Sequence, residues 1–304
     1  MVWVLGRVYV RDAADLSAAR TFQRQIDLRP VSRVGDAAFQ GVYPRPRPPS
    51  TARRIMRELL HELTAEAFFE RFARLTAANP PSPPDPEFAS SVLAPLGIAP
   101  GTPLSWASLA ETQRRALTGG LERVLRVLED RTQLDQQRPV TPAGWSSMAA
   151  RLAQGNYGTS YRVRAAVAVI GLGANLRADA IYMNASVDGN RQPLDGGKRY
   201  HLTFAKDKQP PVHAFWSVTL YDGQGYLIAN PLERYAIKSG DDLVREPDGS
   251  LVIDLSPDDP GPARRANWLP TPDHQPFELS LRAYWPGDEL LDGRWVPPAL
   301  VPAG

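Results

Sequence analysis

The segment 210–222 constrains the fold most strongly. It begins with a pair of prolines, carries large residues on alternate positions, and ends where Asp222 and Gly223 form a turn dipeptide. Alternation with a period of two predicts a β-strand. Runs of the same kind recur through the C-terminal half at a spacing of about ten residues, separated by Asp-Gly and Gly-Gly turns. The predicted strands are 180–187, 200–204, 212–221, 226–230, 251–255 and 277–284.

This spacing is typical of an all-β domain with antiparallel sheets. No regular alternation of strands with crossover helices appears in the same region, so a parallel sheet is not expected. A short helix is predicted over residues 161–170, ended by Gly171 or Gly173, after a loop-like stretch at 145–157. We therefore expect an antiparallel jelly roll or sandwich over residues 139–304.

The first half of the chain has a helical pattern. Residues 51–138 carry apolar stripes at helical spacing and predict a small helical subdomain, with a helix restart near Thr64. Residues 1–10 alternate like a strand, and a helix capped by Asp12 or Asp15 follows. A proline-rich connector at 41–50 separates these parts. The fold class is thus α+β, divided into residues 1–50, 51–138 and 139–304.

Composition excludes several classes of function. The chain of 304 residues contains no cysteine, which rules out disulfides, thiolate nucleophiles and cysteine-ligated metals. Its formal net charge is only +2, and the arginines are interleaved with acidic residues, so no nucleic-acid partner is expected. No apolar run could span a bilayer and no signal peptide is recognisable at the start. No transmembrane segment is expected, and the compartment stays open: the chain as it stands would be cytoplasmic.

No strong catalytic or metal motif is present. The four histidines, His61, His201, His213 and His274, show no metal-binding spacing, and no Gly-x-Ser-x-Gly elbow occurs. The glycines at 171–176 follow a predicted helix and lack the third glycine of a dinucleotide loop. We expect no metal and no cofactor. A metal held by His201 and His213 with Asp222 or Asp254 is the alternative that the spacing leaves open.

Aromatic and amide side chains are dense beside arginines in the C-terminal half. A structural explanation is an aromatic core with arginine and aspartate pairs at its rim. A functional explanation is a concave site whose rings stack on a flat or sugar-like ligand while arginine and asparagine hold its polar atoms. The candidate binding residues are Trp216, Tyr221, Asp222, Asn230, Arg234, Tyr235, Asn267, Trp268 and Arg282, with Tyr284 and Trp285 beside them.

Several of these residues belong to motifs that follow one another in a recognisable order. The motifs lie at 157–158, 171–175, 179–182, 214–217, 219–222, 230–235, 248–251, 267–270 and 281–286. On them, residues 145–300 resemble the bacterial domain of unknown function 1214. Residues 1–30 resemble the end of the domain of unknown function 1254, which precedes it in that family.

The resemblance implies an N-terminal β-sandwich, a helical middle region and a C-terminal jelly roll, with many members exported. Most of the N-terminal domain is expected to be missing here, so residues 1–50 would be its remnant and a linker. That start is either natural or a truncation. The family has no settled activity, so the resemblance predicts architecture rather than chemistry.

The leading functional interpretation is a ligand-binding or interaction protein of the bacterial envelope type. Its partner would be an unknown small molecule or a carbohydrate-like ligand, and a homo-oligomer is possible. The alternative is a hydrolase or isomerase of a small polar or carbohydrate-like substrate that uses Asp222, a histidine and Arg234. His201 or His213 hydrogen-bonded to an acid at the floor of a cleft would favour the enzyme, and scattered histidines would count against it. An inactive truncated homologue is a third interpretation.

Overall fold

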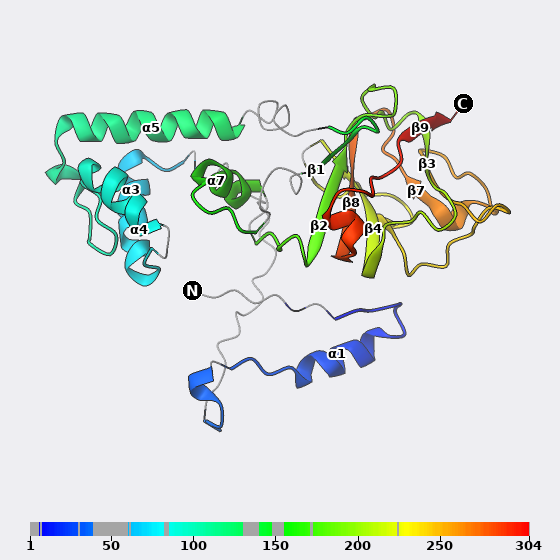
Figure 1. Cartoon of the computed structure of the whole chain (residues 1–304), viewed down its shortest axis with the longest axis horizontal. Coiled ribbons are helices and arrows are strands. Elements are labelled where there is room, and N and C mark those ends of the chain that lie inside the picture. Colours follow the sequence, from blue (N-terminus) through cyan, green and yellow to red (C-terminus); the bar gives the residue numbers. More distant parts are fainter. Residues whose placement is uncertain are drawn as a thin grey trace. The chain divides into compact units, whose positions relative to one another are not determined.

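The computed structural model describes residues 6, 8–29, 31–38, 60, 62–81, 85–129, 140–147, 155–170, 173–223 and 225–303 (Figure 1). The chain forms two compact units. The first contains Met1–Ser82 with Ala89–Leu109, and the second contains Pro83–Phe88 with Ala110–Gly304. No described helix combines the length and the apolar character that crossing a membrane requires.

The described part of the first unit is helical. Helix α1 spans Leu16–Gln25 and helix α3 spans Ala65–Ala78, with shorter helical turns at Val31–Arg33, Ala89–Leu93, Ala94–Leu96 and Trp106–Ser108. The predicted restart near Thr64 is confirmed, because the Thr64 hydroxyl accepts a hydrogen bond of 3.1 Å from the Ala67 amide and caps α3. The connector at 41–50 lies outside the described residues. So do residues 1–5 and 7 of the first predicted strand, and residues 6 and 8–10 form no strand.

The second unit begins with helices and continues into two sheets. Helix α4 spans Asp85–Phe88, α5 spans Glu111–Glu129, and α7 spans Tyr161–Ile170, which confirms the helix predicted there. Asp85 joins α4 to α7, since Nη1 and Nη2 of Arg164 donate to its two carboxyl oxygens at 2.5 and 3.0 Å. The Tyr161 hydroxyl adds a third bond of 3.2 Å, and its ring packs on Phe88.

The hydrogen bonds from Arg164 hold the pKa of Asp85 below its usual value of 3.8. A carboxyl group whose pKa is lowered on folding stabilises the protein above its unfolded value, and this stabilisation is lost as the pH falls through the folded value. Asp85→Asn should therefore destabilise the protein at pH 7 by about 1 kcal/mol or less, since Arg164 is 41% exposed. Urea unfolding at pH 7 and pH 2 measures this, and an equal loss at both would contradict the assignment.

Two antiparallel-rich sheets make up the C-terminal part (Figure 1). The five-stranded sheet has the order β1-β2-β8-β4-β5 and the four-stranded sheet the order β7-β6-β3-β9. All strand pairs are antiparallel except β6 with β7. The strands are β1 Trp145–Ser147, β2 Ala180–Ala185, β3 Arg199–Phe204, β4 Val212–Asp222, β5 Ala236–Lys238, β6 Leu251–Ser256, β7 Trp268–Pro270, β8 Phe277–Pro286 and β9 Leu300–Ala303, with the short helix α8 at Asp288–Leu291.

One hydrophobic core is shared by both sheets. Aromatic rings from the two sheets meet within it: Tyr200 lies 6.0 Å from Phe277, and Phe204 lies 5.5 Å from Trp216. Alternate residues of each long strand enter this core, as the period of two predicts. The mixed α+β class and the antiparallel C-terminal sheets are thus confirmed, whereas the jelly-roll connectivity stays a prediction.

Two local predictions differ from the structure, and three short strands were not predicted. The stretch predicted as a loop at 145–157 contains β1, and the strand predicted at 226–230 is absent, because only Leu227 forms an isolated bridge, to Tyr221. Asp222 and Asn230 use their side chains to hold turns on either side of that segment, so its backbone is not available for a ladder. The sequences of the short strands β5, β7 and β9 show no clear alternation of apolar and polar residues, so the sequence does not predict them.

Candidate functional site

Two of the predicted site residues belong to the interior. Trp216 is 2% exposed and lies in the shared core against Phe204. Trp268 is 7% exposed, and its indole N–H donates a hydrogen bond of 2.9 Å to the Ser256 carbonyl. Both rings therefore contribute to packing, which agrees with the explanation that the aromatic residues form a core.

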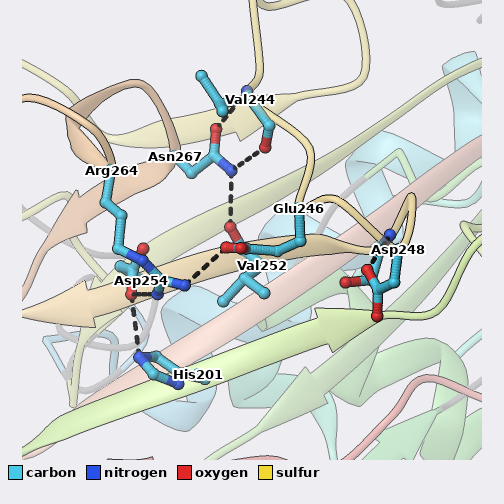
Figure 2. A network of polar contacts seen from close by, with 9 residues as sticks. His201, Val244, Glu246, Asp248, Val252, Asp254, Arg264 and Asn267 are labelled. Carbon is cyan, nitrogen blue, oxygen red and sulfur yellow. Dashed lines mark hydrogen bonds and ion pairs between the residues drawn. The ribbon is translucent and has the colours of Figure 1, made fainter.

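The predicted amides and one arginine bind backbone groups. The Asn267 side chain donates to the carbonyls of Val244 and Val252 at 2.6 and 2.8 Å, and accepts from the Val244 amide at 2.9 Å (Figure 2). Arg234 Nη1 donates to the carbonyls of Arg265 and Trp268 at 2.6 and 3.0 Å. These contacts hold the chain between β6 and β7 in place.

Asn230 closes a loop in the same manner. Its Nδ2 donates to the Ile228 and Arg234 carbonyls, and its Oδ1 accepts from the Arg234 amide at 3.1 Å. Asp222 Oδ1 accepts from the Tyr226 amide at 2.8 Å at the end of β4. Tyr235 is partly buried just before β5, and its carbonyl accepts from the Leu220 amide.

Tyr221 and Arg282 are different, because they lie on the face of the five-stranded sheet that points away from the core. Their strand neighbours Leu220, Leu281 and Ala283 enter the core, and alternation therefore turns Tyr221 and Arg282 outward. Nη2 of Arg282 donates to the Tyr221 hydroxyl at 2.8 Å, and the guanidinium carbon lies 5.3 Å from the ring centroid.

The outward residues of the three central strands form what we call the hydroxyl–arginine face. Arg282 of β8 is directly opposite Tyr182 of β2 on one side and Ser217 of β4 on the other. One step along, Ser280 is opposite Asn184 and Thr219. The face comprises Tyr182, Asn184, Ser217, Thr219, Tyr221, Glu278, Ser280, Arg282 and Tyr284.

Three hydroxyl groups lie at the centre of this face. Ser217, Thr219 and Ser280 are only 8%, 7% and 6% exposed, since longer side chains flank them on the neighbouring positions. Within the described part of the chain, none of these three hydroxyl groups makes a hydrogen bond, and none of their oxygens is fully buried, so they are open to solvent. They are donors and acceptors together, and they lie next to a guanidinium.

An aromatic pair lies at one end of the face, and an exposed tryptophan follows it in the sequence. Phe215 and Tyr284 are opposite each other on β4 and β8, and their rings stack with centroids 4.4 Å apart. Trp285 is 63% exposed and lies 5.2 Å from His213. Its backbone φ is +50°, which a bulky residue adopts only at a cost. The chain thus keeps a large ring at the surface in a strained conformation.

Sequence reasoning found part of this face and missed part. Tyr221 and Arg282 were among the predicted residues, whereas Tyr182, Thr219 and Ser280 were not. The signal that could have identified them is the alternation itself: polar residues between the core residues of adjacent strands share one face. No three His, Asp or Glu side chains of the described ranges are grouped so that they could hold a metal ion.

Comparison with known proteins places this face within a recognised domain. Residues 179–288 match the model of a family described as a protein of unknown function, DUF1214, and this range contains every residue of the hydroxyl–arginine face. The part of the predicted resemblance that concerns domain 1214 is thus confirmed. No curated protein matches the chain.

One similar solved structure is that of the VPA0106 protein from Vibrio parahaemolyticus. It is 19% identical and superposes with a TM-score of 0.54. The alignment covers 96% of the present chain and 66% of the Vibrio chain, so the present chain spans less than two thirds of that protein. At this identity the likeness concerns the fold alone.

Proposed function

We propose that this protein binds a small polar ligand, carbohydrate-like in its hydroxyl groups, on the hydroxyl–arginine face. The observation that supports this most is the group formed by Ser217, Thr219 and Ser280, three largely buried side chains whose hydroxyls stay open to solvent and make no hydrogen bond in the described chain. Each hydroxyl can both donate and accept a hydrogen bond, so a ligand rich in hydroxyls could pair with all three.

Arg282 and the aromatic rings support the same ligand class. A guanidinium binds ring oxygens and carboxylates with charge-assisted hydrogen bonds. The stacked pair Phe215–Tyr284 offers a flat apolar surface on which the C–H face of a sugar can pack. Hydroxyl-rich and apolar contacts side by side match the two kinds of surface that a sugar presents.

Arg282→Gln is expected to weaken ligand binding about 10- to 100-fold, the loss that a charge-assisted hydrogen bond of about 1.5–3 kcal/mol produces. Thermal unfolding in a panel of monosaccharides, uronic acids and polyols detects the ligand as a rise in melting temperature. Arg294→Gln is the matched control, because Arg294 is 65% exposed and contacts Asp292 in a turn. A panel without any stabilising compound, or equal binding by both variants, would contradict the proposal.

The alternative function is a hydrolase or isomerase of a similar polar or carbohydrate-like substrate. One contact favours it: Nε2 of His201 lies 3.0 Å from Oδ1 of Asp254, which is the kind of acid–histidine pair that acid–base catalysis uses. The partners expected from the sequence, Asp222 and Arg234, form hydrogen bonds with backbone groups. Turnover of a nitrophenyl glycoside that His201→Gln abolishes would establish the enzyme.

Several more detailed predictions from the sequence are part of the same proposal. They are jelly-roll connectivity in residues 139–304, a helical subdomain at 51–138, and residues 1–50 as the remnant of domain 1254 with a linker. Association with the bacterial envelope and a homo-oligomer also belong to it. These predictions are supported by the resemblance of the sequence motifs. The family match covers only the part of that resemblance that concerns domain 1214.

A further inference from the structure

A second polar cluster lies on the outward face of the four-stranded sheet (Figure 2). Asp254 of β6 is directly opposite His201 of β3, and its Oδ1 receives two contacts: Nε2 of His201 at 3.0 Å and Nη1 of Arg264 at 2.9 Å. Nη2 of Arg264 donates to Oε1 of Glu246 at 2.6 Å. Four charged or titratable side chains are thus joined in one chain of contacts.

The second oxygen of Asp254 has no partner. The Asp254 side chain is 7% exposed, and Oδ2 is buried without a hydrogen bond in the part of the chain that the structure describes. A buried carboxylate oxygen in that condition loses its hydration without compensation, so native proteins supply a donor from elsewhere. The donor is missing from the described chain, which points to a group that comes from outside it.

Two carboxylates, those of Asp254 and Glu246, supply the acceptors of this cluster. Nε2 of His201 is the ring nitrogen in contact with Asp254, so Nδ1 lies outside that contact. Nη1 and Nη2 of Arg264 donate to Asp254 and Glu246 respectively. The two carboxylates of Asp254 and Glu246 exceed the one guanidinium of Arg264 by one negative charge. A site that offers acceptors and a net negative charge is complementary to a cation that carries several N–H donors.

We propose that this cluster binds a primary ammonium group, the head of a small amine or an amino sugar, with one N–H donated to Oδ2 of Asp254. The ammonium neutralises the remaining charge and donates the bond that Oδ2 lacks. His201, Glu246 and Arg264 are 40%, 39% and 36% exposed, so rotation of these side chains opens a path to Asp254 without a change in the backbone. This site is separate from the hydroxyl–arginine face, which belongs to the other sheet.

The test is a titration of the whole ¹⁵N-labelled chain with ethylammonium chloride, followed by amide chemical shifts. Ethylammonium should shift the amides of β3 and β6, whereas tetramethylammonium, which has the same charge and no N–H donor, should not. Glu246→Gln should weaken binding at least tenfold and Asp254→Asn should abolish it. Asp273→Asn, at an 85% exposed side chain, removes one negative charge away from the cluster and should bind as the parent chain does.

Three results would overturn the proposal. Equal shifts with tetramethylammonium or sodium would show a response to charge alone, and equal binding by Glu246→Gln would show that the cluster is not the site. Shifts confined to β4 and β8 would assign the amine to the hydroxyl–arginine face. Because Glu246 is partly exposed, its variant is expected to fold even if Asp254→Asn does not.

Discussion

Replacing Trp216 by alanine is expected to lower the free energy of unfolding by about 3–5 kcal/mol, the cost of truncating a large aromatic residue in a packed core. Trp216 is 2% exposed and its ring lies against Phe204 of the other sheet, so the cavity would open between the two sheets. Denaturant unfolding followed by far-ultraviolet circular dichroism measures the loss.

Trp285→Ala provides the matched comparison. The Trp285 side chain is 63% exposed, and its backbone amide, which donates to the Asp179 carbonyl, is kept in the variant. The free energy of unfolding should change by about 0.5 kcal/mol or less. A loss of similar size in both variants would contradict the assignment of Trp216 to the core and Trp285 to the surface.

Asn267→Ala is expected to cost about 3 kcal/mol of stability. The amide is 5% exposed and makes three hydrogen bonds to the backbone of Val244 and Val252, and truncation leaves these buried groups without partners. The same denaturant titration measures it, with the exposed Asn190→Ala as the control.

The Asn267→Ala variant also distinguishes a structural role of the predicted binding residues from a direct role in ligand binding. If Asn267 bound ligand directly, its loss would reduce affinity and leave stability almost unchanged. The backbone contacts instead predict a large loss of stability, because the Asn267 side chain fixes the segment that carries Glu246 beside β6 (Figure 2). A stability loss below about 1 kcal/mol would contradict this structural role.

The long strands could be predicted from the sequence, because six to eleven alternating residues show a clear period of two. Strands β2, β3, β4, β6 and β8 all lie where that pattern is found. Strands β1, β5 and β7 have three residues each, and a stretch of that length shows no period. Their pairing is decided by partners that are distant in the sequence.

The candidate site could be predicted only in part for a related reason. Composition identified aromatic and arginine-rich segments, but adjacent strand residues point to opposite faces, so Trp216 lies in the core and Ser217 on the outward face. The contact between His201 and Asp254 depends on the register of β3 with β6, which neither segment reveals alone. Residue types indicate which segments contribute to the candidate site. The strand register decides which of their side chains lie on the same face.

The most direct measurement is an amide chemical-shift map of the whole labelled chain with the sugar or uronic acid that stabilises it most. Binding on the outward side of the five-stranded sheet predicts the largest shifts at Ser217, Thr219, Ser280 and Arg282, and their disappearance in Arg282→Gln. Shifts that leave β4 and β8 unchanged and cluster elsewhere would contradict the account.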